Sequence, residues 1–222
     1  MPTLVHCCYT HRTTLGAPAW SNDQYCVSKF KSALKDKPVR GYAHLVVVPG
    51  EPKRLLNAAN AAAAFAWFGE MSVAWLDERL VSDPVIMPIP GSQCTLNTSE
   101  SRTRRLADAL QRRAGGDVLD VLRFNRASES TRNGGSRDPE DIYPMYRLLD
   151  GVPSGRPIVL VDDVLTSGGH IRAAVAYLTR KGVTSPEITA CCGVSAEQAP
   201  SATPFERKVR ELDDYVDGRE PG

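Results

Sequence analysis

The sequence predicts an α/β protein with a parallel sheet at its centre and helices on both faces of that sheet. The main observation is the apolar run at 158–161, Ile-Val-Leu-Val, which fits a strand buried on both faces. An amphipathic helix is predicted directly after it, at 169–181, and a second strand, turn and helix precede it within 85–113. Strands that alternate with helices are typical of parallel sheets. With 222 residues, 42% of them hydrophobic, the chain can bury one large core.

The N-terminal segment, 1–80, is interpreted as a hood, or cap, over that core. A short lysine-rich helix is predicted at 25–34, and 45–48 has the pattern of an apolar strand. Pro-Gly-Glu-Pro at 49–52 is a turn, and the alanine-rich run at 53–68 has high helix propensity.

The core is predicted to contain further strands before and after the apolar run at 158–161. A helix is expected at about 100–113, capped by Asn97 with Glu100 three residues later. Each further strand is a run of β-branched or aliphatic residues bounded by turn residues. These strands are predicted at 85–89, 118–122 and 187–194.

A polar stretch from Phe124 to Tyr143 separates the predicted strand at 118–122 from the run at 158–161. It is rich in serine, asparagine, glycine and arginine, and it contains Arg132 and Arg137. Such a composition cannot form core, so a mobile loop is predicted.

The chain is predicted to end in a helix and a tail. Thr203-Pro204-Phe205-Glu206 has the pattern of a capping box, and an apolar stripe continues through Val209, Leu212 and Val216. This helix is expected to dock on the body of the protein or on a second subunit, so a homodimer is one alternative. The domain prediction is a hood at 1–80, a core at 81–200 and a C-terminal helix and tail at 201–222, all within one compact domain.

The segment after the apolar run carries the chemistry. Two carboxylates stand where the strand is expected to stop, and ligands of open α/β sheets bind at that end of the strands. The turn that follows offers hydroxyls, close backbone approach at glycine and the amino end of a helix, which together suit an anion of phosphate size. Carboxylates beside such a cradle repel phosphate unless a metal ion or sugar hydroxyls lie between. The candidate binding residues are Asp162, Asp163, Val164, Leu165, Thr166, Ser167, Gly168, Gly169 and His170.

This segment resembles the phosphoribosyl-pyrophosphate (PRPP) signature of type I phosphoribosyltransferases. That signature has four apolar residues, two acids, two apolar residues and a Thr/Ser/Gly turn that normally ends in threonine. The resemblance implies that Asp162 and Asp163 hold the ribose 2′- and 3′-hydroxyls, directly or through Mg²⁺, and that residues 166–170 wrap the 5′-phosphate. The departure is His170, which removes a hydroxyl donor worth on the order of 1–3 kcal/mol unless a ring N–H replaces it.

The resemblance also implies two pyrophosphate contacts. The loop after the strand at 85–89 binds pyrophosphate in that family, which makes Gly91 and Ser92 candidates here. A flexible loop ahead of the PRPP strand closes over the site, with Arg132 and Arg137 as its candidate catalytic donors. For Gly91 and Ser92 the alternative is an ordinary Pro-Gly turn. For Arg132 and Arg137 the alternative is a solvated surface loop.

Within the family, the layout is similar to the ComF-like (competence protein F) group. Oxopurine salvage enzymes carry an aspartate where this chain has Thr166, so that role is disfavoured. The similarity covers about residues 25–195, but the N-terminal cysteine pairs that hold zinc and the Arg-Gly-Phe-Asn-Gln helix start are missing. A doubly wound receiver-type fold is a further alternative, although the segment after the acids is too short for the rest of that site.

Two functions are therefore expected from the resemblance. The first is a Mg²⁺-dependent phosphoribosyltransferase that moves the 5-phosphoribosyl group to a nitrogenous acceptor and releases pyrophosphate. The second is a non-catalytic PRPP or nucleotide sensor, or a ComF-like partner-binding protein in nucleic-acid processing. The implied ligands are PRPP or a nucleoside 5′-monophosphate.

The composition disfavours nucleic acid and membranes as direct partners. The formal net charge is only +1, which is too small for general binding to either surface. The most apolar stretch, 58–76, is interrupted by Asn60, Gly69 and Glu70, and it fits core helices better than a membrane span. The N-terminus lacks the pattern of a signal peptide. A cytoplasmic protein is expected.

The six cysteines agree with a reducing compartment. No C-x-x-C occurs, so neither a disulfide framework nor a zinc knuckle is predicted. Buried or unused thiols are the favoured interpretation, and a metal held near the N-terminus is the alternative. The residues for that alternative are His6, Cys7, Cys8, His11 and Cys26.

Overall fold

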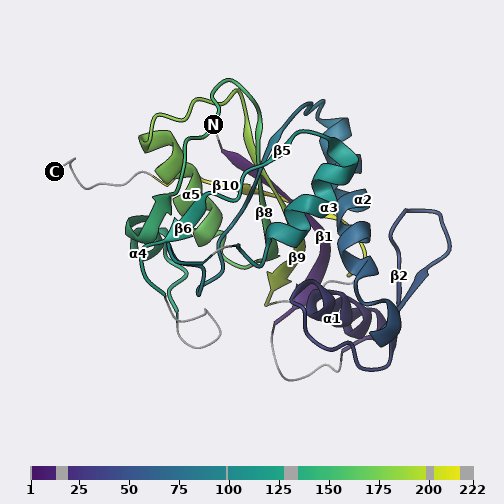
Figure 1. Cartoon of the computed structure of the whole chain (residues 1–222). Helices are drawn as coiled ribbons and strands as arrows, with labels where there is room; N and C mark the ends of the chain where they lie inside the picture. Colours follow the sequence, from purple (N-terminus) through teal and green to yellow (C-terminus); the bar gives the residue numbers. More distant parts are fainter. Residues whose placement is uncertain (1, 14–19, 99, 128–134, 199–202, 216–222) are drawn as a thin grey trace.

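A computed structural model of the chain shows a six-stranded sheet between two layers of helices (Figure 1). The structure describes residues 2–13, 20–98, 100–127, 135–198 and 203–215. Every pair of neighbouring strands in the sheet is parallel except the pair that includes the last strand. The order across the sheet is β10 (Lys208–Leu212), β1 (Thr3–Arg12), β9 (Ile188–Glu197), β8 (Ile158–Leu165), β4 (Val85–Pro88) and β5 (Asp117–Val118).

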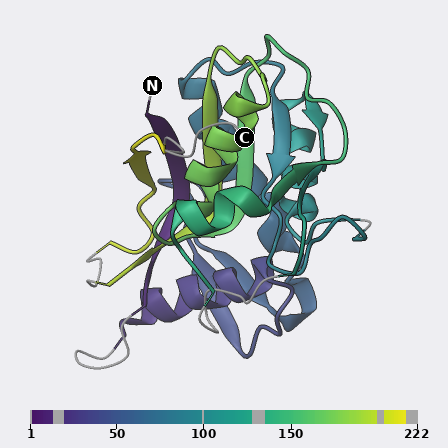
Figure 2. The same cartoon turned by 90° about the vertical axis from the view of Figure 1, so that its left-hand side faces the viewer.

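Helices cover both faces of this sheet, as the sequence predicts. Three helices, α1 (Asn22–Leu34), α2 (Ala63–Glu78) and α3 (Arg104–Ala114), lie on one face, and α4 (Pro139–Ile142) and α5 (Gly169–Arg180) lie on the other. Figure 2 shows α5 in front of the sheet.

Successive side chains of β8 point to opposite faces of the sheet, which explains why the core has two sides. Val159 and Val161 are buried with α1, α2 and α3, whereas Ile158 and Leu160 are buried with α5. An apolar side chain at every position is what a strand between two helix layers requires.

Two small antiparallel two-stranded sheets lie outside the central sheet. One pairs β2 (Tyr42–Leu45) with β3 (Arg54–Asn57). The other pairs β6 (Leu122–Phe124) with β7 (Tyr146–Leu148). Short 3₁₀ turns follow β3 at η1 (Ala58–Asn60) and precede β7 at η3 (Tyr143–Met145).

The prediction of a C-terminal helix is wrong. Thr203 and Glu206 do interact, with 2.6 Å between their side-chain oxygens, but the chain turns there and continues as β10, antiparallel to β1. Without β10, the outer edge of β1 would present unpaired backbone groups, and pairing satisfies them. Leu212, at the end of β10, is buried. Residues 216–222, which include the expected tail at 218–222, lie outside the described part.

The segment 1–80, predicted as a hood within one compact domain, contributes to the central sheet and to the helix layer on one of its faces. Strand β1 runs inside the central sheet, between β9 and β10. The expected helix at 53–68 is also shifted: residues 54–57 form β3, and α2 begins only at Ala63. Pairing of β3 with β2 outweighs the helix propensity of this segment.

The start of α3 differs from the prediction for a local reason. The helix begins at Arg104, so Asn97 and Glu100 do not cap it. The hydroxyl of Thr103 instead donates to the Ile89 carbonyl at 2.6 Å, and the Ser101 amide donates to Asp120 at 2.8 Å. These bonds tie the chain ahead of α3 to the end of β4 and to the segment between β5 and β6. The predicted strand at 118–122 is likewise divided between β5 and β6.

Within the described ranges, no helix has both the length and the apolarity that a membrane span needs. The longest is α2, with 16 residues.

Candidate functional site

The predicted ligand residues gather at the carboxyl edge of the sheet. Strands β1, β9, β8 and β4 are parallel, so their carboxyl ends share one edge. Asp162 and Asp163 lie near the end of β8, and Gly91 and Ser92 follow β4. Strand β8 continues through the acid pair to Leu165, so the strand is longer than predicted. A Cβ placed on Gly91 would meet no atom within 4 Å, so the backbone there is open to a ligand.

Asp163 is held by two cations that the sequence analysis did not place in the site. Lys35, directly after α1, brings its Nζ to 3.4 Å from Asp163 Oδ1. Arg102, just before α3, brings its Nη2 to 3.0 Å from Asp163 Oδ2. The carboxylate is buried, with 5% of the residue exposed. Arg102 belongs to a basic cluster visible in the sequence, but its partner lies 61 residues away in the chain.

Asp162 has a different environment although it is the next residue. Its Oδ1 accepts a hydrogen bond from the Asp163 amide at 2.7 Å. Asp162 keeps a small exposed surface, yet protein surrounds the carboxylate closely. Burial, and then the charge of Asp163, raise the pKa of Asp162 above its ordinary value, while the Asp163 amide, Lys35 and Arg102 oppose the shift. The free protein therefore has one carboxylate paired with two cations beside one whose pKa is raised by burial.

The turn from Thr166 to His170 is fixed from both sides. Arg210 of β10 donates to the Thr166 carbonyl at 2.7 Å. The Ser167 hydroxyl donates to the Arg137 carbonyl at 3.1 Å and accepts from the Gly169 amide at 3.3 Å. Helix α5 begins here, so its amino end faces the turn, as expected for an anion site.

Both glycines of this turn are needed for close approach. Gly168 has φ +85°, in the left-handed region, and an added Cβ would lie 2.7 Å from Leu212 Cδ1. A Cβ on Gly169 would lie 2.0 Å from the Arg137 carbonyl oxygen. The backbone at Arg137 therefore packs directly on the cradle, while its side chain is exposed. Arg132, the other predicted loop donor, lies outside the described residues.

His170 stands where the PRPP signature has threonine. Its ring centroid lies 5.9 Å from that of Phe124, and its carbonyl accepts a hydrogen bond from the Tyr146 hydroxyl at 3.0 Å. Burial lowers the pKa of His170, and the charge of Asp163 opposes this. Within the described part of the chain, its buried Nδ1 has no hydrogen-bond partner. A neutral ring can still donate or accept one bond to a ligand.

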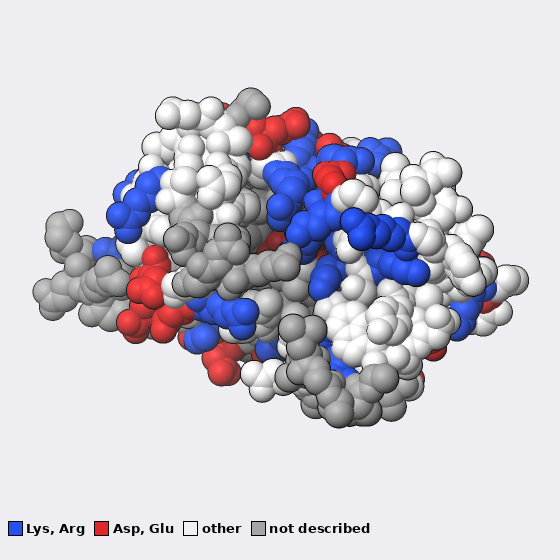
Figure 3. Space-filling model, turned by 90° about the horizontal axis from the view of Figure 1, so that it is seen from below, with Lys and Arg blue, Asp and Glu red and all other residues white. Residues whose placement is uncertain are grey.

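The carboxyl edge is rich in positive charge. Figure 3 looks onto this edge, and lysine and arginine side chains gather near its centre. The basic side chains nearest to Asp163 are Lys35 and Arg102, and Arg105 lies farther out, paired with Asp36. This charge suits a polyanionic ligand, although the net charge of the whole chain is only +1.

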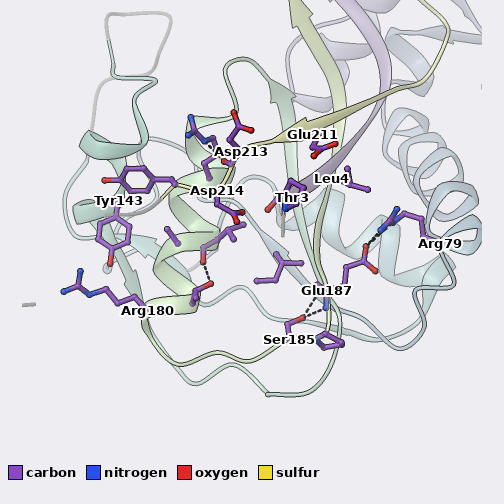
Figure 4. A pocket seen from close by; sticks show the side chains of 18 residues that line it. Thr3, Leu4, Arg79, Tyr143, Arg180, Ser185, Glu187, Glu211, Asp213 and Asp214 are labelled. Atoms are coloured by element: carbon purple, nitrogen blue, oxygen red, sulfur yellow. Dashed lines mark hydrogen bonds and ion pairs between the residues drawn. The ribbon is translucent and has the colours of Figure 1, made fainter. Parts of the chain in front are cut away.

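A large cavity lies elsewhere. It measures about 940 Å³ and is lined by the start of β1, by Val175 and Ala176 of α5 and by the segment after β10 (Figure 4). Thr3 and Ile188 place it at the amino ends of β1 and β9, opposite the acid pair. Size alone does not make it the reaction site, because the paired acids and the cradle are at the other edge.

The cysteines do not form a metal site in the structure. All six are free and buried. Across the described ranges, no three His, Cys, Asp or Glu side chains gather in a way that could hold a metal ion. His6, from the metal alternative, instead stacks on Trp75 with 5.3 Å between ring centroids.

Two plant enzymes resemble part of the chain in sequence. A uracil phosphoribosyltransferase from Nicotiana tabacum is 33% identical over 76 residues, which are 33% of this chain and 34% of that protein. The chloroplastic uracil phosphoribosyltransferase of Arabidopsis thaliana is 35% identical over 71 residues, 31% of this chain and 24% of that protein. The match thus spans about a third or less of these relatives. No family model matches the chain.

Two solved structures are similar in arrangement. Adenine phosphoribosyl transferase from Trypanosoma brucei, in complex with AMP, pyrophosphate and ribose-5-phosphate, has a TM-score of 0.42 at 12% identity, covering 86% of each chain. Adenine phosphoribosyltransferase from Saccharomyces cerevisiae has a TM-score of 0.39 at 16% identity, covering 74% of this chain and 89% of that chain.

Proposed function

We propose that this chain binds PRPP at the carboxyl edge of its sheet and transfers the 5-phosphoribosyl group to a nitrogenous acceptor, releasing pyrophosphate. One observation carries the proposal: the acid pair at the end of β8 leads into a hydroxyl- and glycine-rich turn that opens α5. The partial similarity to uracil phosphoribosyltransferases supports it. With six buried free cysteines, a reducing, cytoplasmic setting is part of the proposal.

Each part of PRPP has a proposed contact. Asp162 and Asp163 bind the ribose hydroxyls, and residues 166–170 hold the 5′-phosphate through backbone N–H groups, hydroxyls and the amino end of α5. Gly91 and Ser92 contact the pyrophosphate from the end of β4. Arg137, whose backbone packs on the cradle, and Arg132 are the proposed sources of further positive charge.

The donor set at the acid pair fits Mg²⁺. This ion prefers oxygen ligands, keeps several waters and is usually bound by one or two carboxylates together with substrate phosphates. Asp162 and Asp163 provide two adjacent carboxylates, and water and PRPP would complete the shell. When bound, the ion would neutralise part of the pyrophosphate charge.

The reaction is a displacement at ribose C1. The lone pair of the acceptor nitrogen forms the new bond to C1 as the C1–O bond breaks, and pyrophosphate leaves with that bond's electrons. The nitrogen then gives up its proton to water or to the released pyrophosphate. We propose that Lys35 and Arg102, which neutralise Asp163 in the free protein, would stabilise the departing negative charge. Packing of the segment at Arg137 on the cradle would exclude water from the oxocarbenium-like sugar.

The test is calorimetric titration of Mg²⁺ and PRPP into the protein and into the double variant Asp162→Asn, Asp163→Asn. We expect the variant to lose at least a hundredfold in affinity while its circular dichroism spectrum stays unchanged. Asp77→Asn, an exposed acid on α2, is the matched control and should bind like the parent. Unchanged affinity in the double variant would exclude this site.

A second candidate is a PRPP or nucleotide sensor with the ComF-like layout, which binds the ligand without turning it over. The observation that favours it is His170, which replaces the threonine of the signature and whose Nδ1 has no partner in the described structure. Pyrophosphate release with candidate acceptors separates the two, because a sensor releases none.

The variant His170→Thr tests the cradle itself. If a hydroxyl donor is missing, this change should tighten PRPP binding about three- to tenfold, equivalent to on the order of 1 kcal/mol. Weaker binding in calorimetry would mean that the histidine ring already contacts the phosphate.

A further inference from the structure

A buried ion pair lies beside the segment that leads from β4 to α3, and it has no role in the function proposed above. Arg123 of β6 is 1% exposed, and its Nη1 donates to Asp120 Oδ1 at 2.6 Å. The Asp120 side chain is 4% exposed. Burial of two opposite charges is costly unless further hydrogen bonds satisfy them. The other partners of the pair therefore indicate what it holds in place.

Two of those partners are backbone groups in the segment between β4 and α3. The second carboxylate oxygen of Asp120 accepts a hydrogen bond from the Ser101 amide at 2.8 Å. Arg123 Nε donates to the Thr98 carbonyl at 3.3 Å. Hydrogen bonds between a charged group and the backbone are stronger than those between neutral groups. The buried pair therefore anchors the last residues of the segment before it enters α3.

Strand β6 also anchors the first part of the same segment. The Phe124 amide donates to the Cys94 carbonyl at 3.0 Å. Cys94 is buried and closely follows Gly91 and Ser92, the proposed pyrophosphate contacts. The chain at 120–124 therefore fixes this segment near both of its ends.

Arg102 is the residue of this segment that reaches the acid pair. Its neighbours Ser101 and Thr103 are each 3% exposed, and the Thr103 hydroxyl donates to a backbone carbonyl just after β4. The Arg102 side chain is 50% exposed, and its Nη2 lies 3.0 Å from Asp163 Oδ2. A long exposed side chain loses rotamer freedom when it binds a ligand. A backbone that is fixed on both sides of Arg102 reduces the range of positions that its guanidinium can take.

We propose that Asp120 and Arg123 are positioning residues that act through Arg102. They fix the backbone before α3, so that the Arg102 guanidinium stays beside Asp163 in the free protein and meets the pyrophosphate when PRPP binds. Both charged side chains are buried and do not touch the ligand themselves. This inference rests on the proposed function, because Arg102 has a pyrophosphate to meet only if PRPP binds at the acid pair.

PRPP and ribose 5-phosphate form a matched pair of probes, since they share the sugar and the 5′-phosphate and differ by the pyrophosphate. The main variant is Asp120→Leu with Arg123→Met, which removes both charges at similar volume and leaves neither unpaired in the interior. In calorimetry with Mg²⁺, we expect PRPP affinity to fall about tenfold and ribose 5-phosphate affinity to stay within about twofold of the parent. A general loss of structure would weaken the binding of both ligands.

Thr103→Val is a milder variant, which carries the test if the apolar pair does not fold. It keeps the shape of the side chain and removes the hydroxyl that donates to the carbonyl after β4. We expect it to lose about three- to tenfold in PRPP affinity, with ribose 5-phosphate affinity unchanged. The control is Arg79→Gln with Glu187→Gln, an ion pair at the opposite edge of the sheet, which should bind both ligands like the parent.

A double-mutant cycle tests whether the pair acts through Arg102. Arg102→Gln alone should weaken PRPP binding about tenfold, and adding the apolar pair to it should change the affinity by less than about twofold. Additive losses would show that Asp120 and Arg123 act on the fold in general, and they would overturn the inference.

NMR relaxation of the Arg102 side-chain Nε–H in the free protein needs no ligand. We expect an ordered side chain in the parent and a mobile one in the apolar-pair variant and in Thr103→Val. If Arg102 responds in this way but the parent does not bind PRPP, the positioning role stands and the transferase proposal fails. If the parent binds PRPP and the variants bind it equally well, the transferase proposal stands and the positioning role is refuted.

Discussion

Asp162 and Asp163 are adjacent in the chain but meet opposite sides of the sheet. Asp163 is paired with Lys35 and Arg102 on the side of α1 and α3. Asp162 faces the other layer, where burial, and then the charge of Asp162, raise the pKa of Tyr146. Alternation along a strand therefore gives two identical side chains different surroundings.

The raised pKa of Asp162 makes the stability of the free protein depend on pH. Its pKa in the folded chain lies above the ordinary value of 3.8, so the folded state favours the protonated acid. Stability from this residue is present at low pH and is lost as the pH rises through the raised pKa. We expect Asp162→Asn to be near neutral at pH 4 and to stabilise the unliganded protein at pH 8 by on the order of 1–2 kcal/mol.

Urea unfolding at the two pH values measures this effect. Asp163→Asn is the contrasting variant: it should destabilise the protein at pH 8, because Lys35 and Arg102 lose their partner. Equal effects of the two substitutions at pH 8 would contradict the assignment of different environments.

At the scale of elements, β10 has two roles. It pairs with the outer edge of β1, and it contacts the turn at 166–168, which we propose as the phosphate cradle. Arg210 donates to the Thr166 carbonyl, Leu212 packs against Gly168, and Arg172 of α5 donates to the Asp213 carbonyl at 2.9 Å. A strand far from the motif in sequence therefore helps to shape the motif.

Leu212→Ala tests this support. The side chain is 5% exposed, so truncation should cost about 2–4 kcal/mol of unfolding free energy through lost burial and a cavity. It should also weaken Mg²⁺-dependent PRPP binding several-fold, because the turn at Gly168 loses its contact. Denaturation and calorimetry measure the two effects. Val209→Ala on the same strand is the control, and since that residue is 45% exposed it should change neither quantity appreciably.

At the scale of the whole molecule, the N-terminal residues are part of the main core. Strand β1 is enclosed by β9 and β10, and α1 and α2 are buried in the same cluster as α3. A boundary at residue 80 would remove one strand from within the sheet and two helices from one of its faces. The ligand edge would lose Lys35 as well.

Expression of residues 81–222 alone tests whether the N-terminal residues are needed for the core to fold. The fragment should lack cooperative thermal unfolding and dispersed amide resonances, because β10 would have no partner strand and β9 would have an unpaired edge. The full chain under the same conditions is the control. A cooperatively folded fragment would show that the segment 1–80 is not needed for the rest of the chain to fold.

The sequence alone determined the buried strand, the acid pair, the cradle and the following helix. Those features depend on patterns within about fifteen residues. Side chains alternate with a period of two in a strand and recur every 3.6 residues in a helix, and glycine and hydroxyl side chains favour turns. The α/β class and the presence of helices on both faces were predictable for the same reason.

Only the tertiary structure decided which distant groups complete the site. Lys35 and Arg102 reach Asp163 from separate elements, and no spacing in the sequence joins them. Apolar residues near 205–212 satisfied a helical period, but the free edge of β1 selected a strand, because backbone groups at that edge need partners. Local pattern fixes what a segment can form, whereas long-range pairing and charge decide which of the possible forms is stable in the folded chain.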